Sequence, residues 1–476
     1  MRTSSHAVFS FSAMTAIFQP AAATSAQNLS TTQVLEQLHA LLQPPGPVAE
    51  QETLSLADAL DRVLAQDVIC PVNVPPHDNS AMDGYAFASA DLAAAQQGQL
   101  SLRVVGTVLA GSPWTQAVAA GECVKIMTGA VMPVGLDTVV PHEQVSAQND
   151  PKDDTIAFDA SRLAPGANRR LCGEDLRQGE VALQAGQRLT PAALGLLASL
   201  GLGQATVRRR LRVAYFSTGD ELLSPGAQPR EGAIYDSNRF SLQGLLRRMG
   251  ADVLDLGSVP DEPNALEARL REATALADVV LTSGGISAGE ADHTRAMLQR
   301  LGSVQFWRVA MRPGRPLAVG LLCAETGGDE KFQAKTASSQ ANTLTTSSQN
   351  SSISFPGQRP TVLLGLPGNP VAAMVSFLMF ARPALDMLAG VKSKPLPMLE
   401  VPASEPMRKR PGRTEYLRGV LEVNGQGQTT VRTTGAQGSG LLSSMVLANC
   451  IIVLGDARSD VHPGESVPVL PLQGLL

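Results

Sequence analysis

The chain has 476 residues, enough for about three domains, and its content of 44% hydrophobic and 17% charged residues excludes wholesale disorder. A formal net charge of −5 and an aromatic content of 4% argue against a nucleic-acid partner, and no run of about 18 apolar residues predicts a membrane-spanning helix. Five scattered cysteines without CxxC spacing are typical of a reducing compartment, so we expect a cytoplasmic protein without a zinc ribbon.

The chain begins with a Ser/Ala/Thr-rich stretch, residues 1–27, which we expect to be a disordered leader. The spacing of apolar residues then predicts two helices, the first with Val34, Leu35, Leu38, Leu41 and Leu42 on one face and the second with Leu56, Leu60, Val63 and Leu64. A further helix is expected where Thr190 can cap a helix that starts with Pro191. Residues 28–72 and 162–207 are therefore predicted to form one split, elongated helical domain.

Three more domains are predicted by changes in the sequence pattern. Residues 73–161 should be β-rich, because short Val-rich stretches alternate there with Gly and Pro turns. Residues 208–393 alternate strands with helices, which predicts a three-layer α/β domain with a mostly parallel sheet, interrupted by a low-complexity loop insertion at 324–360. Residues 394–476 should form a small C-terminal β domain, so the expected fold class is multidomain α/β plus β.

The carboxyl ends of the strands in the predicted α/β domain carry candidate ligand-binding residues. Three of the strand-end turns supply a carboxylate, at Glu221, Asp261 and Asp292. A Ser-Gly-Gly loop at 283–285 can point backbone N–H groups at an anion. Because the carboxyl ends of parallel strands meet at one edge of a sheet, we expect these turns to converge on one crevice.

Three arginines, Arg308, Arg312 and Arg315, follow on a segment that glycine and proline stiffen. Guanidinium groups bind phosphates and other oxyanions, and carboxylates bind divalent cations and ring N–H donors. Together with the carboxylate turns, these arginines predict a site for a phosphorylated ligand, although they do not identify the reaction.

A series of short motifs then follows one order along the chain. PPHDNSAMDGYA at 75–86 and KIMTGA at 125–130 are followed by motifs at residues 173–175, 217–221, 234–238, 283–292, 365–370, 412–413 and 437–439. This series resembles the molybdopterin molybdenumtransferase family, to which bacterial MoeA and the E domain of gephyrin belong. The resemblance extends over nearly all of residues 28–470, and the leader has no counterpart in it.

The resemblance implies a homodimer of four-domain subunits with an active site that the two subunits share. It implies that Asp83 and Thr128 enter the cleft from the other subunit, whereas Asp83 on its own would be interpreted as a turn residue. Glu221, Asp261 and Asp292 are implied to be catalytic residues of the subunit's own cleft. The residues implied to bind the pterin substrate are Ser217, Thr218, Gly219, Asp220, Asn238, Ser283, Gly284, Gly285, Pro367, Gly368, Asn369 and Pro370.

The implied reaction is the insertion of molybdate into adenylylated molybdopterin with release of AMP, in molybdenum cofactor biosynthesis. The candidate molybdate-binding residues are Arg308, Arg312, Arg315, Arg413 and Ser439, which supply cationic and hydroxyl donors. Mg²⁺ at the pyrophosphate would be held by Glu221, Asp261 and Asp292, and any one of the three could bind the pterin instead. Family members commonly carry lysine in the segment of Arg308, Arg312 and Arg315, so the individual anion contacts stay open.

Two alternatives remain on the sequence alone. One is the molybdopterin adenylyltransferase that precedes this step and shares the α/β pterin-binding domain, and the other is a non-catalytic pterin-binding or scaffold protein. The carboxylates at Asp83, Glu221, Asp261 and Asp292 favour the molybdenum-inserting enzyme. We expect transient contacts with the adenylyltransferase and with molybdoenzyme maturation proteins, and neither a nucleic-acid nor a membrane partner.

Overall fold

The structure is a computed structural model that describes residues 28–43, 46–147, 154–285, 297–298, 300–323, 359–392 and 395–475. The chain divides into two compact units. The first comprises Met1–Gly46, Arg210–Leu388 and Ser393–Leu476, and the second comprises Pro47–Arg209 and Ala389–Lys392. Three sequence predictions fall outside the described residues. They concern the leader at 1–27, Asp292, and most of the loop insertion, residues 324–358.

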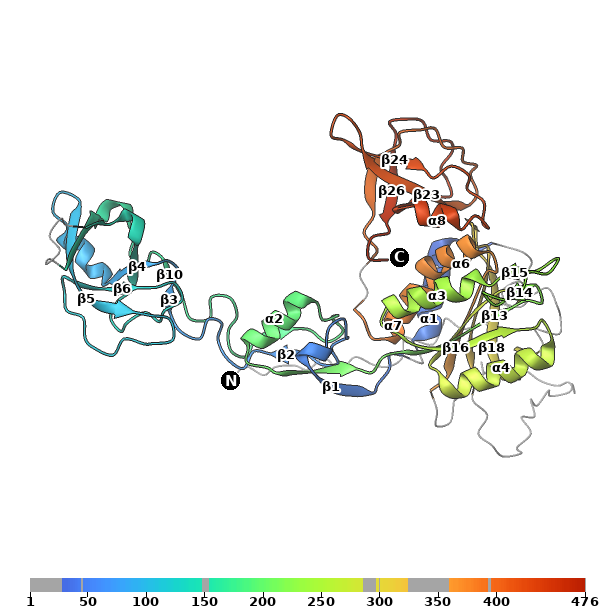
Figure 1. Ribbon diagram of the computed structural model, residues 1–476, viewed down its shortest axis with the longest axis horizontal. Coiled ribbons are helices and arrows are strands. Elements are labelled where there is room, and N and C mark those ends of the chain that lie inside the picture. Colours follow the sequence, from blue (N-terminus) through green and yellow to red (C-terminus); the bar gives the residue numbers. More distant parts are fainter. Residues whose placement is uncertain are drawn as a thin grey trace, which may run out of the picture. The chain divides into compact units, whose positions relative to one another are not determined.

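A six-stranded sheet forms the centre of the α/β part of the first unit (Figure 1). Its strands follow the order β16 (Asp252–Val259), β13 (Arg212–Thr218), β17 (Val279–Ser283), β21 (Thr361–Leu366), β20 (Pro316–Leu322) and β18 (Gly302–Arg308). The first four strands are parallel, whereas β20 runs antiparallel to both β21 and β18. The predicted mostly parallel sheet is therefore confirmed, with β20 as the one strand of the six that runs in the opposite direction.

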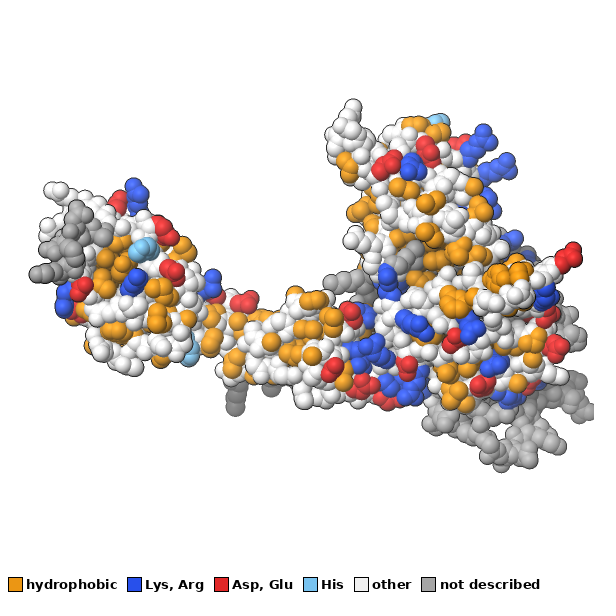
Figure 2. Space-filling model, in the orientation of Figure 1, with side chains coloured by type: hydrophobic (Ala, Val, Ile, Leu, Met, Phe, Trp, Pro, Cys, Tyr) orange, Lys and Arg blue, Asp and Glu red, His pale blue; other side chains and the backbone are white. Residues whose placement is uncertain are grey.

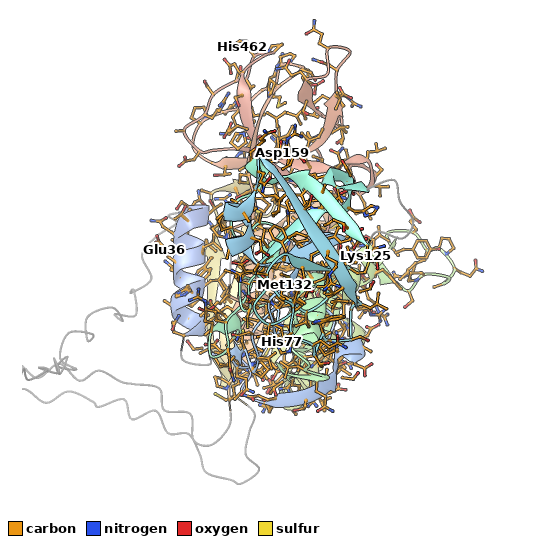
Figure 3. The ribbon with its side chains drawn as sticks, turned by 90° about the vertical axis from the view of Figure 1, so that its left-hand side faces the viewer. Glu36, His77, Lys125, Met132, Asp159 and His462 are labelled. Atoms are coloured by element: carbon orange, nitrogen blue, oxygen red, sulfur yellow. The ribbon has the colours of Figure 1, made fainter. Side chains whose placement is uncertain are left out.

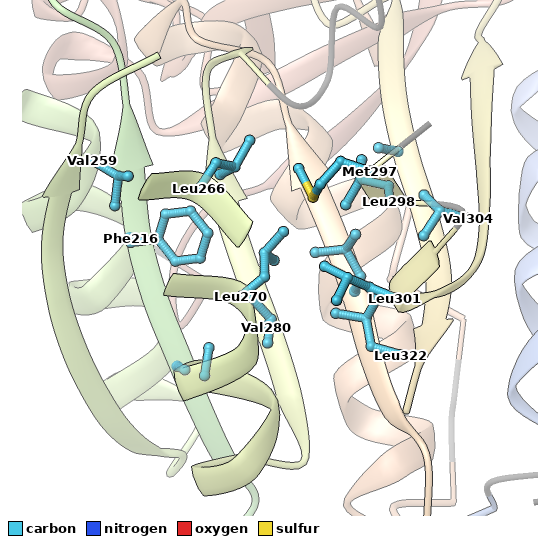
Figure 4. Packing of buried hydrophobic residues seen from close by; sticks show 14 residues of the cluster. Phe216, Val259, Leu266, Leu270, Val280, Met297, Leu298, Leu301, Val304 and Leu322 are labelled. Carbon is cyan, nitrogen blue, oxygen red and sulfur yellow. The ribbon is translucent and has the colours of Figure 1, made fainter. Parts of the chain in front are cut away.

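Helices cover both faces of this sheet, which gives the predicted three layers. On one face, Leu266 and Leu270 of α4 pack with Phe216 of β13 and Val280 of β17 (Figure 4). On the other face lie α3 and α6, which contact each other (Figure 1). The helices around the sheet are α1 (Thr31–Leu42), α3 (Ser237–Arg248), α4 (Pro263–Leu276), α6 (Pro370–Ser376) and α7 (Arg382–Leu388), and a π-helical turn, Phe377–Ala381, joins the last two.

One segment, Pro370–Leu388, is long and apolar enough to cross a bilayer, although the sequence predicts no membrane span. In the structure, 67% of its most apolar window is buried. Phe377, Phe380 and Leu385 are at most 2% exposed. The segment therefore packs as the central core helix of the first unit.

The first helix, α1, forms as the sequence predicts. Ser30 caps it, since its hydroxyl accepts from the Gln33 N–H at 3.2 Å while the Gln33 side chain accepts from the Ser30 N–H at 2.8 Å. Its apolar stripe packs against α7, while Glu36 points outward (Figure 3). Two predictions differ from the structure here: Leu35 is 37% exposed, and α1 belongs to the first unit rather than to a domain with residues 162–207.

A second sheet forms the C-terminal part of the first unit, where a β domain was predicted. Its strands are β19 (Met311–Arg312), β23 (Thr414–Val423), β25 (Cys450–Leu454), β26 (Ser466–Pro471) and β22 (Leu399–Pro402), with β24 (Thr429–Thr433) paired to β23 and the short helix α8 (Ser443–Leu447) beside it. The strand β19 comes from the α/β sequence and pairs in parallel with the start of β23. This pairing places the arginine segment next to the C-terminal sheet. A smaller pair of parallel strands, β14 (Leu222–Leu223) and β15 (Ile234–Tyr235), completes the unit.

The second unit is centred on another six-stranded sheet, which agrees with the predicted β-rich stretch. Its strands follow the order β7 (Thr138–Pro141), β4 (Gly84–Phe87), β6 (Glu122–Ile126), β5 (Gln99–Val108), β9 (Thr155–Asp159) and β8 (Ser146–Ala147). Only β5 and β6 are parallel within it. Gly84 is needed where β4 and β7 meet, because a Cβ there would lie 2.0 Å from the Val140 carbonyl oxygen. Short 3₁₀ helices flank the sheet at Ser89–Ala94, His142–Gln144 and Ala160–Arg162.

The rest of the second unit is less helical than predicted. α2 (Pro191–Ser199) forms behind its Thr190 cap, but the predicted helix over Leu56 to Leu64 is wrong. A single helical turn, Leu56–Asp58, is followed by Asp61 at φ 60°, a left-handed conformation that ends a right-handed helix. The remaining strands of this unit pair as β1 (Gln51–Ser55) with β12 (Gln204–Arg208), β2 (Val68–Ile69) with β11 (Val181–Leu183), and β3 (Asn79–Ser80) with β10 (Arg169–Arg170).

Candidate functional site

A cavity of about 960 Å³ lies at the carboxyl edge of the parallel strands in the first unit. The strand ends and α6 contribute Thr218, Glu221, Asp261, Gly284, Gly285, Pro367, Gly368, Asn369 and Ala372. The segment between β18 and β20 contributes Met311, Arg312, Pro313, Gly314, Arg315 and Pro316. The C-terminal part contributes Arg413, Gln437, Gly438 and Ser439. Carboxylates from the strand-end turns and arginines from the other two segments thus line one cavity.

The register of the parallel strands explains why turns distant in sequence meet here. Ser283 at the end of β17 pairs with Ser217 of β13 and with Leu366 of β21, so three strands end at the same level. Thr218 pairs with Val259, which brings the end of β16 alongside. The convergence of the strand-end turns that the sequence predicts is therefore present.

The glycine loop after β17 packs tightly against the end of β13. Gly284 has a φ of 112°, and a Cβ on it would lie 2.3 Å from the carbonyl oxygen of Thr218, so no other residue fits without a shift. The Gly285 N–H donates to the Thr218 hydroxyl at 2.6 Å. A Cβ on Gly285 would lie 2.8 Å from Oδ1 of Asp261, which shows how closely that carboxylate approaches the loop.

Asp261, Glu221 and Asp220 form a group of like charges beside this loop. Desolvation raises the pKa of Asp261, and the nearby charges of Asp220 and Glu221 raise it further. Asp220 also accepts the Asp261 backbone N–H at 3.2 Å, so it orients the turn while Asp261 and Glu221 line the cavity. A cation between the carboxylates would remove this repulsion.

The two cavity carboxylates suit a hard cation that keeps most of its waters. Among the described residues there is no cluster of three or more His, Cys, Asp or Glu side chains close enough to cage a metal ion. Mg²⁺, however, commonly binds through one or two carboxylates, waters and a substrate phosphate. Glu221 and Asp261 therefore fit Mg²⁺ bound together with a phosphorylated ligand.

The cavity is also lined by arginines, and other residues orient them. Arg315 donates to the side-chain carbonyl of Asn28 at 3.0 Å, and Arg413 donates through Nε to the buried carboxylate of Glu415 at 3.2 Å. Arg312 belongs to β19, and in the pairing of β19 with β23 its backbone lies opposite that of Glu415. Arg308 is not among the described cavity-lining residues, and at the end of β18 its carbonyl accepts the Leu29 N–H at 2.8 Å.

Several predicted pterin-binding residues support the cavity from behind instead of lining it. The hydroxyls of Ser217 and Ser283 lie 2.8 Å and 2.7 Å from the Tyr215 hydroxyl, a buried group whose pKa desolvation raises. Asn238 donates to the Gly368 carbonyl at 2.6 Å. Gly219 and Pro370 also lie next to lining residues, at the ends of the β13 and β21 turns, without lining the cavity themselves.

The structure adds cavity residues that the sequence interpretation did not assign. They are Met311, Pro313, Gly314, Pro316, Ala372, Gln437 and Gly438. Gln437 and Gly438 are next to Ser439 in the same motif, so that motif was a usable signal. Gly314 is constrained on two counts, a φ of 98° and a Cβ position 2.4 Å from the Ser376 hydroxyl.

Asp83 and Thr128 lie together in the second unit. Oδ1 of Asp83 accepts both the backbone N–H and the hydroxyl of Thr128, each at 2.7 Å. The backbone bond from Thr128 is the main cause that lowers the pKa of Asp83. Both residues are exposed, so they present one ionised carboxylate and a hydroxyl to solvent.

Three family models together match most of the chain. They are the MoeA N-terminal region (domain I and II) at residues 29–201, the probable molybdopterin binding domain at 214–387, and the MoeA C-terminal region (domain IV) at 400–472.

Relatives and solved structures agree with these matches. The chain is 39% identical over 446 residues to a protein from Haemophilus influenzae named molybdopterin molybdenumtransferase, covering 94% of this chain and 98% of that protein. A protein of the same name from Nostoc sp. is 32% identical over 426 residues, covering 89% of each. Two structures of the molybdopterin biosynthesis protein MoeA from Pyrococcus horikoshii match with TM-scores of 0.67 and 0.72 at 25% and 24% identity, each over 94% of this chain. The chain therefore belongs to the molybdopterin molybdenumtransferase family.

Proposed function

We propose that this protein inserts molybdate into adenylylated molybdopterin and releases AMP, as a molybdopterin molybdenumtransferase of molybdenum cofactor biosynthesis. The observation that carries the proposal is that the carboxylates Glu221 and Asp261 line the same cavity as Arg312, Arg315 and Arg413. Such a cavity matches the charges of the substrates, an oxyanion and a pyrophosphate that needs a divalent cation.

The oxyanion binds on the arginine side. Molybdate is a dianion with four oxygens, and guanidinium and hydroxyl groups are suitable donors to it. Arg312, Arg315, Arg413 and Ser439 supply these donors in our proposal, and Asn28 and Glu415 hold two of the arginines in place. Arg308 has no direct role at the anion in this assignment, because it does not line the cavity in the part of the chain that the structure describes.

The phosphoanhydride of the adenylylated substrate binds on the carboxylate side. Glu221 and Asp261 would hold Mg²⁺ there, and Asp292 joins them by the family resemblance. Mg²⁺ held there would neutralise the pyrophosphate and would stabilise the charge that develops when the phosphoanhydride breaks. The backbone of Gly284 and Gly285 and the turn at Pro367 and Gly368 shape the floor on which the pterin lies.

We further propose a homodimer in which Asp83 and Thr128 complete the site of the other subunit. Three observations support this proposal. The two side chains are hydrogen-bonded to each other, they are exposed, and they lie outside the unit that holds the cavity. The protein would act in the cytoplasm and meet the adenylyltransferase and molybdoenzyme maturation proteins transiently. Acidic, basic and hydrophobic side chains all occur on the face drawn in Figure 2. We propose no nucleic-acid partner and no membrane partner.

One assay separates this function from the two alternatives. The purified protein is given adenylylated molybdopterin, Mg²⁺ and molybdate, and AMP release is followed with and without molybdate. Molybdate-dependent release supports insertion. Consumption of ATP with molybdopterin would instead identify an adenylyltransferase, and substrate binding without turnover would identify a scaffold protein.

A further inference from the structure

Arg418 is the largest fully buried side chain in the described part of the chain, with 0% of its surface exposed. It lies in the middle of β23, and no Asp or Glu of the described residues forms an ion pair with it. Arginine is rarely buried completely unless a carboxylate pairs with it, because desolvation of the charge is costly. Burial and the nearby charge of Arg312 together lower its pKa to about 10, so it remains a cation at neutral pH.

Several hydrogen bonds of Arg418 lead to the segment that lines the cavity from the C-terminal side. Its Nη2 donates to the Gly438 carbonyl at 3.1 Å, and its Nε donates to the Ser444 hydroxyl at 3.0 Å. Its backbone N–H donates to the Gln437 side chain at 2.8 Å, and its carbonyl accepts from the same side chain at 3.1 Å. Arg418 therefore holds residues 437–439, the 437–439 loop, by main chain and side chain together.

The other side of this loop is fixed to the α/β part of the unit. The Val371 N–H at the start of α6 donates to the Ser439 carbonyl at 3.1 Å. The loop thus spans between α6 and β23, and all three of its residues line the cavity. A substitution at Arg418 would remove the side-chain bond to Gly438, one of the contacts that hold the loop to β23.

The charge of Arg418 is also less compensated than that of Arg413, which lies just before β23. Arg413 has its charge partly offset by Glu415 at 3.2 Å, whereas the closest charge acting on Arg418 is the cation Arg312. Two guanidinium groups that repel each other beside a cavity favour an anion in that cavity. The uncompensated charge is therefore useful where an oxyanion binds and costly elsewhere.

We propose that Arg418 is a positioning residue for the oxyanion: it fixes the 437–439 loop from behind and adds uncompensated positive charge to the arginine side of the cavity. This inference rests on the proposed function, since it takes molybdate as the anion. Arg418 itself does not line the cavity, so its effect passes through Gly438, Ser439 and the electrostatic field.

The test uses the full chain and two substitutions. Arg418→Met keeps an unbranched side chain but removes its charge and bonds, and Arg418→Lys keeps the charge but cannot reach Gly438 and Ser444 together. The matched control is Arg432→Met, an arginine on neighbouring β24 that pairs with Glu422 at 3.2 Å and does not line the cavity. Binding of sodium molybdate and sodium tungstate is measured by calorimetry.

We expect Arg418→Met to weaken oxyanion binding at least tenfold, Arg418→Lys to recover part of the loss, and Arg432→Met to change it less than twofold. In turnover, Arg418→Met should raise the KM for molybdate more than it lowers kcat, a split that a general loss of folded protein would not produce. Wild-type binding by a folded Arg418→Met variant would overturn the inference.

A second variant covers the case in which Arg418→Met does not fold. Ser444→Ala removes one acceptor of the guanidinium and lies outside the cavity lining. It should raise the molybdate KM at least threefold, and an unchanged KM would also overturn the inference. If the wild type binds the oxyanion but releases no AMP, the proposed function fails while the positioning role of Arg418 stands.

Discussion

The backbone N–H of Gly285 donates a 2.6 Å hydrogen bond to the hydroxyl of Thr218, and this bond ties the end of β17 to the end of β13 at the cavity. The Thr218 side chain is only 4% exposed, so the bond is protected from water. The position of the glycine loop, and of Asp261 next to it, depends on this contact.

Thr218→Val should therefore loosen the loop without changing the volume of the side chain. We expect the free energy of unfolding to fall by about 1 kcal/mol, the usual net value of one hydrogen bond. The kcat/KM for AMP release should fall about tenfold, because the substrate would meet a displaced floor. The control is Thr53→Val, an exposed residue of β1, which should change neither quantity.

Gly284 should tolerate no side chain, and the reason can be separated from backbone strain. Gly284→Ala introduces a Cβ 2.3 Å from the Thr218 carbonyl oxygen at a φ of 112°. Gly226 has a φ of 90° with nothing within 4 Å of its Cβ position, so Gly226→Ala carries the strain alone. Chemical denaturation should show a loss for Gly284→Ala that is larger by about 1–3 kcal/mol, as for overpacking. Equal losses would mean that the loop can move away.

Two aspartates of the first unit should have opposite effects on stability. The pKa of Asp261 is raised by desolvation and by repulsion from Asp220 and Glu221, so its charged form is unfavourable in the folded protein. Asp261→Asn should therefore melt at a higher temperature than the wild type at pH 7, and the gap should shrink as the pH falls below the raised pKa. Activity should nevertheless be lost, since the variant removes a Mg²⁺ ligand in our proposal.

Asp255→Asn is the matched comparison. Nε and Nη2 of Arg239 donate to the Asp255 carboxylate at 2.9 to 3.0 Å. The pKa of Asp255 is lowered. The ionised form stabilises the fold above the unfolded-state pKa, and this contribution disappears as the pH falls through the lower folded-state value. The variant should melt below the wild type at pH 7 and approach it below about pH 4. Thermal melts of both variants from pH 3 to pH 8 check the two signs together.

Much of the α/β fold could be predicted because its signals are local. The apolar run before Thr218 predicts the strand β13, and the amphipathic pattern of α4 predicts that helix. Parallel strands then place their carboxyl ends at one edge of the sheet. The helix expected over Leu56 to Leu64 shows the limit. Apolar residues there have helical spacing, yet Val63 and Leu64 form bridges with Arg188 and Val207, far along the chain.

The cation side of the site was harder to predict for the same reason. Arg312 meets Glu415 because β19 pairs with β23 across about a hundred residues of sequence, and no local pattern indicates that pairing. The sequence pattern does not determine whether the Arg418 side chain is exposed to solvent or buried in the core. Its burial follows from the packing of α8 and the 437–439 loop over that strand.

The proposed sharing of the site between two subunits can be tested by mixing two variants that we expect to be inactive. Asp83→Asn and Arg413→Ala chains, co-expressed with different tags and purified as a mixed dimer, should recover about half of the wild-type activity, since one of the two shared sites is then intact. The control mixes Arg413→Ala with Asp261→Asn, whose changes both lie in a subunit's own cavity. That mixture should stay inactive, and recovery there, or none in the first, would count against a site shared between subunits.

The most direct measurement is the stoichiometry of the reaction. The wild-type protein is incubated with adenylylated molybdopterin, Mg²⁺ and limiting molybdate, and the AMP released and the molybdenum bound to the pterin are determined in the same samples. The proposed function predicts that each molybdenum atom inserted accompanies the release of one AMP, and that no AMP appears when molybdate is left out. AMP release at the same rate without molybdate, or molybdenum insertion without AMP, would contradict it.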